Sequence, residues 1–284
     1  MNLNATIRSA TKADAHRIDQ FLKSGVRYHR HLDWRKPTDW LGRSPFIIQI
    51  TPNNEISAIL NCVSEPEDIY WLRLFACNEP QNENTTWETL FTTAFEIIKN
   101  QSTDPVIASL SYQKWFSDLL INNGWHEQQQ VVQFQWEGNQ SMLFDAISPN
   151  PAIRLMAEDD INKVASIDDR CFQPIWQQSK EAIRYAFYQT GYATVYLMNN
   201  AIVGFQISTS DFDKAHLARI AVLPEYQRNH IGEQLVIDML QFFSIKRISK
   251  ITVNTQENNS NSIALYKKLN FRVINGAFPI FIYR

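Results

Sequence analysis

Residues able to hold an anion lie between an apolar run and a helical pattern in the C-terminal third of the chain. The apolar run at residues 216–222 ends before Pro224, and the polar turn 227–232 follows it. The first turn of a helix leaves backbone N–H groups unpaired and carries partial positive charge. A phosphate placed there gains about 1.5–3 kcal/mol from each charge-assisted hydrogen bond. The pattern therefore predicts a strand, an anion-binding turn and a helix.

The elements that must position this turn follow from apolar spacing. Ile231, Leu235, Met239 and Phe242 recur at helical intervals, which predicts an amphipathic helix over residues 232–243. A second apolar run at residues 251–253 leads through an Asn-rich loop into another helical pattern. Asn and Ser are good N-caps, so we expect this helix to begin near Ser260. That start places Asn259 and Tyr266 two turns apart, where they can share a face.

Together these segments resemble the acyl-CoA-binding half of the GCN5-related N-acetyltransferase (GNAT) family. The family's turn reads Gln or Arg, two variable residues, Gly, one variable residue, then Gly or Ala. Gln227 and Gly232 match it, and His230 stands at the first glycine position. Histidine is one of the few other residues that tolerate positive φ. The family's Leu-Tyr and Leu-Gly-Phe ending is similar to residues 265–266 and 269–271, with Asn270 in place of glycine. Asn can also take the left-handed conformation that a helix C-cap requires.

The resemblance implies acetyl-CoA as cosubstrate and no metal. Backbone N–H groups of the strand at residues 220–222 would orient the thioester and stabilise the oxyanion that forms on it. The implied cofactor-binding residues are Ile220, Ala221, Val222, Gln227, Arg228, Asn229, His230, Ile231, Gly232, Glu233 and Asn259.

The implied reaction is attack of a free amine on the thioester, with departure of a thiolate. By family analogy, Tyr266 would protonate the leaving sulfur. The reference pKa values of Tyr and a thiol, about 10 and 8.5, make that transfer uphill by about 2 kcal/mol. The alternative interpretation is that Tyr266 only packs the helix.

The attacking amine must also lose a proton. Some relatives carry a glutamate where this chain has Thr252, so we predict His216 as the general base. His216 shares strand parity with Ala218 and Ile220, which predicts that all three face one side. Arylalkylamine-type members of the family carry a histidine at the matching place. A solvated strand-end histidine remains the other interpretation, and weaker candidate bases are water, Glu257, Asp211 and Asp213.

Internal similarity predicts an α+β fold made of two tandem GNAT-like domains, each a twisted mixed β-sheet flanked by helices. Ile7-Arg8 with a helical pattern at 14–22 recurs as Ile153-Arg154 with one at 159–169. Residues 71–76 resemble 217–222, and the runs 105–110, 115–125 and 131–136 mirror 251–253, the Tyr266 helix and 279–283. We expect domains at 1–145 and 151–284, joined near residues 148–151.

The first copy is expected to be degenerate. Its counterpart of the phosphate turn, residues 78–84, has no glycine and carries two carboxylates that would repel a pyrophosphate. Leu120 stands where the second copy has Tyr266. This copy would support the second domain or supply one wall of its acceptor pocket. In the second copy, Phe172 and Trp176 flank Pro174 in the predicted acceptor loop, where they either hold an acceptor or fill the core.

Composition narrows the remaining possibilities. The chain has 284 residues, 44 % of them apolar, and can build two cores. A net charge of −2 without a dense basic run predicts no nucleic-acid partner, and short apolar runs predict no membrane span. No signal-peptide core is evident, so a cytoplasmic location is expected. The three cysteines lack metal-ligand spacing.

The predicted function is therefore an acyl-CoA-dependent N-acetyltransferase acting on a primary amine through the second domain. The acceptor is a small-molecule amine or a protein amine, and its identity and the oligomeric state stay open. The alternative is a non-catalytic module that senses acyl-CoA or acts as a scaffold, because His230 and Thr252 depart from the family pattern.

Overall fold

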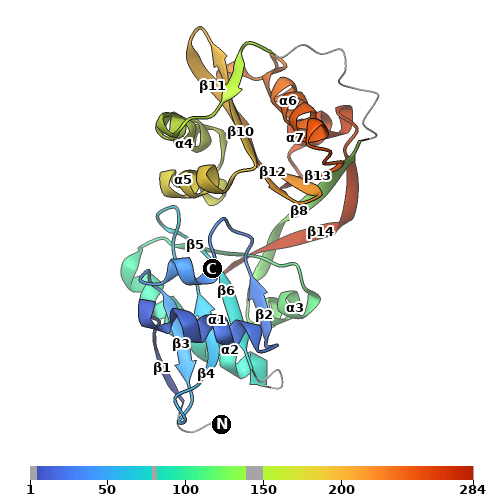
Figure 1. Cartoon of the computed structure of the whole chain (residues 1–284). Helices are drawn as coiled ribbons and strands as arrows, with labels where there is room; N and C mark the ends of the chain where they lie inside the picture. Colours follow the sequence, from blue (N-terminus) through green and yellow to red (C-terminus); the bar gives the residue numbers. More distant parts are fainter. Residues whose placement is uncertain (1–4, 79–81, 139–149, 284) are drawn as a thin grey trace. The chain divides into compact units, whose positions relative to one another are not determined.

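The computed structural model describes residues 5–78, 82–138 and 150–283, which fold into two compact units (Figure 1). Met1–Gln129 and Phe278–Arg284 make the first unit, and Gln130–Ala277 make the second. Each contains β-strands flanked by helices, which confirms the predicted α+β class. No helix in the described part of the chain is long and apolar enough to cross a membrane.

The first unit begins with a strand and a helix, and further strands and helices follow. Its elements are β1 (Thr6–Ser9), α1 (Ala15–Lys23), β2 (Arg27–Arg30), β3 (Phe46–Ile50), β4 (Ile56–Asn61), β5 (Ile69–Trp71), β6 (Leu74–Cys77), α2 (Glu83–Gln101), β7 (Val106–Leu110) and α3 (Lys114–Asn122). The single strand expected at residues 71–76 is broken after Trp71. Its first part, β5, pairs in parallel with β7, whereas β6 pairs with β4 and β2.

The second unit has a similar but not identical order of elements. After β8 (His126–Glu137) it contains β9 (Ile153–Leu155), α4 (Ile161–Cys171), the short 3-10 helix η5 (Pro174–Trp176), α5 (Lys180–Gln189), β10 (Tyr192–Met198), β11 (Ala201–Asp211), β12 (Lys214–Val222), α6 (Ile231–Ile245), β13 (Lys250–Gln256), α7 (Ser260–Lys268) and β14 (Arg272–Tyr283). Helices α4 and α5 cover one face of its strands, and α6 and α7 cover the other (Figure 1).

The start of each unit is fixed in the same way. Arg8 forms an ion pair of 2.7 Å with Asp14, and Arg154 forms one of 2.6 Å with Asp160. Both carboxylates also accept a hydrogen bond from the backbone N–H three residues earlier. These contacts hold the pKa of each carboxyl below its usual value. The repeated pair supports the internal similarity predicted from Ile7-Arg8 and Ile153-Arg154.

The last strand of each repeat belongs to the other unit. Residues 131–137 of β8 pair antiparallel with β13, and Phe134 and Trp136 join the core of the second unit. Residues 280–283 of β14 pair with β7, and Phe281 joins the core of the first unit. The units therefore differ from the expected 1–145 and 151–284, because two strands are exchanged. The expected joint near 148–151 begins outside the described residues.

The core of the second unit confirms the predicted helix at residues 232–243. The buried stripe of α6 includes Leu235, Val236, Met239 and Phe243, and it packs on Leu217 of β12. Phe242 lies at the margin and stacks on Tyr192 with ring centroids 3.8 Å apart. This packing fixes the start of α6 beside the end of β12.

Candidate functional site

Strands β12 and β13 part in the middle of the second unit. They pair in parallel only from Lys214 and Lys250 to Leu217 and Val253. Beyond this point β12 stays paired with β11, and β13 stays paired with β8 as far as Gln256. Residues 218–222 of β12 therefore border a split between the two strands. The strand at residues 220–222, along which the family resemblance places the thioester, therefore lies at this split.

A β-bulge marks the point where the strands part. The partner of Ile207 is Arg219 and the partner of Ser208 is Leu217, so Ala218 is the extra residue. Leu217 and Ile220 both pack toward the core under α6, although an unbroken strand would place them on opposite faces. His216 is then on the face opposite Ile220. The expectation that His216, Ala218 and Ile220 share a face is wrong, because the bulge reverses the alternation.

The turn after β12 is held by its own side chains. Gln227 donates from Nε2 to the Val222 carbonyl at 3.0 Å, and Asn229 donates to the Tyr226 carbonyl at 3.2 Å. Arg228 and His230 both have positive φ, at 62° and 59°. His230 is the N-cap of α6, so the amides of residues 231–233 lie in the first helical turn. The predicted tolerance of histidine for this conformation is confirmed.

The Glu233 carboxylate beside the turn has two side-chain partners. The Glu233 carboxylate lies 2.7 Å from Lys268 Nζ and 2.9 Å from His230 Nδ1. Lys268 first, and His230 second, hold the pKa of Glu233 below its usual value. The only carboxylate among the predicted cofactor residues is therefore paired with the Lys268 ammonium, which lowers its repulsion of a phosphate.

Gly232 lies where the first turn of α6 meets β12 and α7. A Cβ atom at this position would be 3.6 Å from Leu265 and 3.9 Å from Val222, which are ordinary contacts. Alanine therefore fits, in agreement with the family's choice of Gly or Ala. A longer side chain would extend between the end of β12 and α7, which is where the split opens.

Helix α7 begins at Ser260, as predicted. Asn259 caps it by accepting a hydrogen bond of 3.1 Å from the Ser262 amide. Tyr266 is only 2 % exposed and packs between Phe134 and Phe271. Burial raises its pKa above the ordinary value, and a hydrogen bond with Ser262 opposes the shift. Tyr266 therefore keeps its proton, and its transfer to a thiolate is further uphill than the reference values imply.

His216 pairs with Thr252, one position before the last pair of β12 and β13. Its Nδ1 is 2.9 Å from the Thr252 hydroxyl. Burial lowers the pKa of His216 to about 4, below the 6.5 expected from the sequence. The imidazole is neutral at physiological pH but is a weak base. The alternative bases Glu257, Asp211 and Asp213 are all exposed.

One ion pair was not predicted from the sequence, that of Asp168 with Arg219. Arg219 Nε lies 2.6 Å from Asp168 Oδ2, and the Asp168 side chain is fully buried. Arg219 also stacks on Phe172, with Cζ 3.5 Å from the ring centroid. An arginine inside the otherwise apolar run 216–222 was the available signal. Phe172 and Trp176 are half-buried, so neither is a plain core residue.

The equivalent split in the first unit is filled. Strand order β1-β3-β4-β6 corresponds to β9-β10-β11-β12, but β2 continues the first unit's order beside β6. His29 of β2 stacks on Phe116 of α3, with ring centroids 3.9 Å apart. Leu120 is fully buried in that unit's core. The counterpart turn at residues 78–84 lies in part outside the described residues, because 79–81 are not described.

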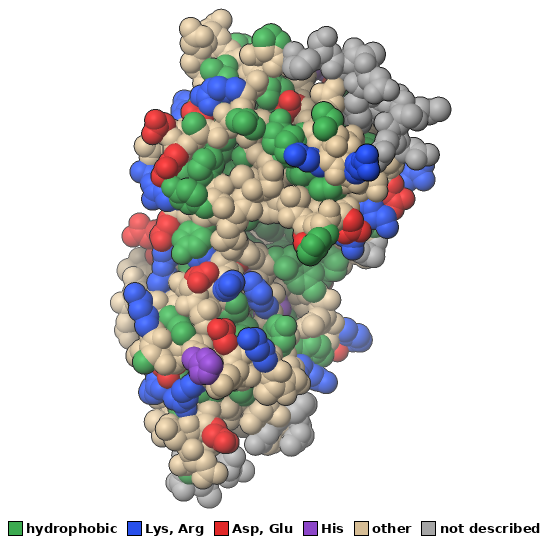
Figure 2. Space-filling view, in the orientation of Figure 1, with side chains coloured by type: hydrophobic (Ala, Val, Ile, Leu, Met, Phe, Trp, Pro, Cys, Tyr) green, Lys and Arg blue, Asp and Glu red, His purple; other side chains and the backbone are tan. Residues whose placement is uncertain are grey.

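Cysteines, metal-ligand side chains and surface charge are the other features that could support chemistry. All three cysteines are free thiols. Within residues 5–78, 82–138 and 150–283, no group of three His, Cys, Asp or Glu side chains is placed to hold a metal ion. On the face shown in Figure 2, Lys and Arg side chains are interspersed with Asp and Glu, in keeping with the small net charge.

Comparison with known proteins agrees with this geometry. Residues 161–271, which lie in the second unit, match the acetyltransferase (GNAT) family. The predicted family resemblance is confirmed for these residues, which include the split, the turn and α7.

Individual relatives cover different parts of the chain. The [Ribosomal protein bS18]-alanine N-acetyltransferase of Haemophilus influenzae is 32 % identical over 77 residues, which are 27 % of this chain and 52 % of that protein. The chain thus spans about half the length of the curated relatives it matches.

Two solved structures are similar over nearly the whole chain. A tandem GNAT protein from the clavulanic acid biosynthesis pathway has a TM-score of 0.67 at 11 % identity, covering 99 % of this chain and 98 % of that one. A GCN5-related N-acetyltransferase from Sphaerobacter thermophilus has a TM-score of 0.60 at 13 % identity, covering 98 % and 95 %. At these identities the likeness shows the fold alone, which is the predicted tandem GNAT fold.

Proposed function

We propose that this protein is an acetyl-CoA-dependent N-acetyltransferase that acetylates a primary amine in its second unit. One observation carries the proposal: the split between β12 and β13 lies directly before the first turn of α6, inside the segment that matches the GNAT family. The thioester of acetyl-CoA can lie along the edge of β12 while the diphosphate of the same cofactor contacts the amides of residues 231–233.

The reaction is direct transfer. The amine nitrogen attacks the thioester carbonyl, a C–N bond forms, and the C–S bond breaks as the thiolate leaves. Backbone N–H groups at residues 220–222 stabilise the oxyanion. Tyr266 supplies a hydrogen bond or a proton to the sulfur, and the raised pKa of its phenol favours the hydrogen bond. The proton of the amine passes to His216 or to water.

The acceptor is a small-molecule amine or a protein amine. The relative from Haemophilus influenzae is named for acetylating an alanine of a ribosomal protein, which makes a protein N-terminus one candidate class. The proposed reaction involves no nucleic acid, membrane or metal. The first unit acts as support and binds no acyl-CoA.

A non-catalytic acyl-CoA sensor is the second candidate. The specific observations that favour it are the lowered pKa of His216 and the raised pKa of Tyr266, because both weaken proton transfer at neutral pH.

Thermal unfolding with acetyl-CoA, free CoA and no ligand separates these functions when it is combined with an assay of thiol release. A ligand at a hundredfold excess over Kd stabilises the fold by about 2.7 kcal/mol. A shift with thiol release in the presence of an amine panel supports the enzyme. A shift without thiol release for any amine favours the sensor, and no shift rejects both.

A further inference from the structure

Arg219 is the residue that follows the bulge at Ala218. Its guanidinium makes two hydrogen bonds to Asp168, of 2.6 and 2.8 Å, and a third of 2.6 Å to the Trp176 carbonyl. Its remaining face stacks on the Phe172 ring. The side chain is 12 % exposed and Asp168 is fully buried. The charge of Arg219 is therefore directed toward α4, and little of its side chain is accessible to a ligand.

Asp168 also connects its ion pair with Arg219 to the loop after α4. Its Oδ1 also accepts a hydrogen bond of 2.8 Å from the Gln178 amide. Gln177 closes the loop by donating to the carbonyls of Asp169 and Phe172. The loop at residues 172–178 is therefore fastened at Trp176 and Gln178 to one ion pair, whose other member lies on β12.

A second contact ties the end of α4 to the end of β12. Cys171 donates from its thiol to the Val222 carbonyl, with a distance of 3.3 Å. Burial raises the pKa of Cys171 to about 11, so the thiol keeps the proton that it donates. Arg219 precedes residues 220–222, the proposed thioester edge, and Val222 is the last residue of that edge. Both ends of this edge are held by the same turn of α4.

The first unit also has an Arg–Asp pair and an aromatic ring at its strand break, although its carboxylate comes from the segment after β2 and not from a helix. Arg73, which aligns with Arg219, lies 2.6 Å from Asp33. Its Cζ is 4.3 Å from the Trp40 ring centroid, which repeats the stacking of Arg219 on Phe172. In this unit β2 covers the strand edge, so the arginine has no thioester to contact. The shared role is to hold the break in the strand.

We propose that Arg219 is a positioning residue that, through Asp168, sets the thioester edge at residues 220–222 and the loop at residues 172–178 in one fixed relation. This role rests on the proposed acetyl transfer, in which the loop lies on the acceptor side. Arg219 touches no reacting atom. It determines how the attacking amine approaches the thioester, and it contributes little to the affinity for the cofactor.

The test uses Arg219→Lys in the full chain. Lysine keeps the positive charge beside buried Asp168 but loses the planar fork that binds the carboxylate and the Trp176 carbonyl together. The double variant Asp168→Asn/Arg219→Gln, which removes both charges, serves if the lysine variant folds poorly. Arg154→Lys breaks an Arg–Asp pair elsewhere in the same unit, and Arg73→Lys breaks the equivalent pair of the first unit.

Hydrogen exchange without ligand tests whether Arg219 holds the two segments in place. We expect faster amide exchange in both residues 172–178 and residues 218–222 of Arg219→Lys, with neither control variant changing these segments. Faster exchange in only one segment, or in none, overturns the proposal. This measurement needs no turnover, so it stands even if the wild-type protein proves inactive and the proposed function fails.

Kinetics decide the consequence for the reaction. Loss of alignment lowers kcat by about 10- to 100-fold, and the Kd of acetyl-CoA, measured by calorimetry, stays within about threefold because the phosphate turn is untouched. An unchanged kcat in a variant whose two segments have loosened overturns the positioning role. A loss of affinity equal to the loss of kcat overturns it as well, because Arg219 would then act on cofactor binding.

Discussion

The two units interrupt the equivalent strand, by a break after Trp71 in the first and by the bulge at Ala218 in the second, but they differ in how the exposed edge is covered. In the second unit, residues 218–222 of β12 lie beside the split from β13. In the first unit, β2 forms hydrogen bonds along β6 and closes the equivalent edge. The difference comes from the segment after the first helix, which forms β2 in one unit and η5 with α5 in the other. A sheet edge without a partner is available to a ligand, and a paired edge is not.

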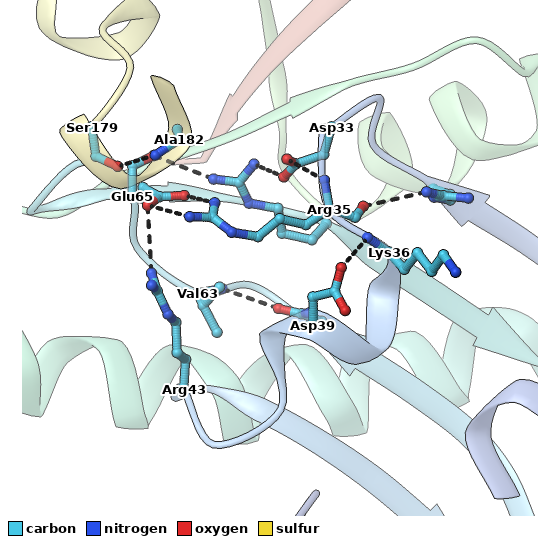
Figure 3. Close-up of polar contacts among 12 residues, drawn as sticks. Asp33, Arg35, Lys36, Asp39, Arg43, Val63, Glu65, Ser179 and Ala182 are labelled. Carbon is cyan, nitrogen blue, oxygen red and sulfur yellow. Dashed lines mark hydrogen bonds and ion pairs between the residues drawn. The ribbon is translucent and has the colours of Figure 1, made fainter. Parts of the chain in front are cut away.

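The segment after β2 is fixed by ion pairs. Arg35 contacts Glu65, and Arg43 lies 3.6 Å from the same carboxylate (Figure 3). The Lys36 amide donates to Asp39 at 2.8 Å. Arg73, at the strand break, holds Asp33. These contacts hold the segment after β2 in place. They therefore support the position of β2, which covers the strand edge in the first unit.

The comparison predicts one cofactor site for each chain. Isothermal titration calorimetry with CoA should give about one equivalent bound, because β2 occupies the first unit's edge. A stoichiometry of two would show that a strand beside the edge does not exclude acyl-CoA, and the contrast between the units would fail.

Closing the second split should remove binding. Gly232→Val adds atoms between the end of β12 and α7, and we expect at least a hundredfold weaker binding of CoA, or about 2.7 kcal/mol. Gly232→Ala is the matched control, since its Cβ makes only ordinary contacts and should leave Kd within about threefold. Thermal unfolding without ligand confirms that both variants fold. Equal affinities for the two variants would place the cofactor elsewhere.

Tyr266 and Leu120 stand at equivalent places in the two repeats. Removing the hydroxyl with Tyr266→Phe makes the second unit resemble the first, and kcat should fall by about 10- to 100-fold with little change in acetyl-CoA affinity. Tyr192→Phe is the control, because Tyr192 is another tyrosine of the same unit whose pKa is raised by burial. A normal kcat in Tyr266→Phe would remove this residue from the mechanism.

Both units contain histidines whose pKa is lowered by burial, His29 and His31 in the first unit and His216 in the second. Burial lowers the pKa of His29 to about 3 and that of His216 to about 4. The unfolded chain binds more protons between these values and about 6.5, so the free energy of unfolding is highest above pH 6.5 and falls as the pH is lowered. Each histidine should cost about 1–2 kcal/mol between pH 7 and pH 5.

His29→Phe and His216→Gln test the two contributions separately. Phenylalanine preserves the stacking on Phe116, and glutamine can still reach Thr252. Each variant should flatten the dependence of stability on pH, measured by urea unfolding at pH 7 and pH 5. The same slope in a variant and the wild-type protein would show that the histidine concerned is not desolvated in solution.

The amino-acid sequence alone predicted the local parts of the site. Apolar spacing located α6, and the preferences of Asn and Ser for N-caps located the start of α7 at Ser260. The positive φ of His230 and of Asn270 also followed from residue type. These features depend on a few neighbouring residues, so a short stretch of sequence contains the information that determines them.

Only the tertiary structure decided the features that separate the two units. The bulge at Ala218, the exchange of β8 and β14 and the pairing of β2 with β6 each depend on segments far apart in the chain. Arg219 looked like an interruption of an apolar strand until α4 brought Asp168 to it. Local propensity cannot choose a strand's partner or its register, because hydrogen bonds and buried contacts between distant segments set both.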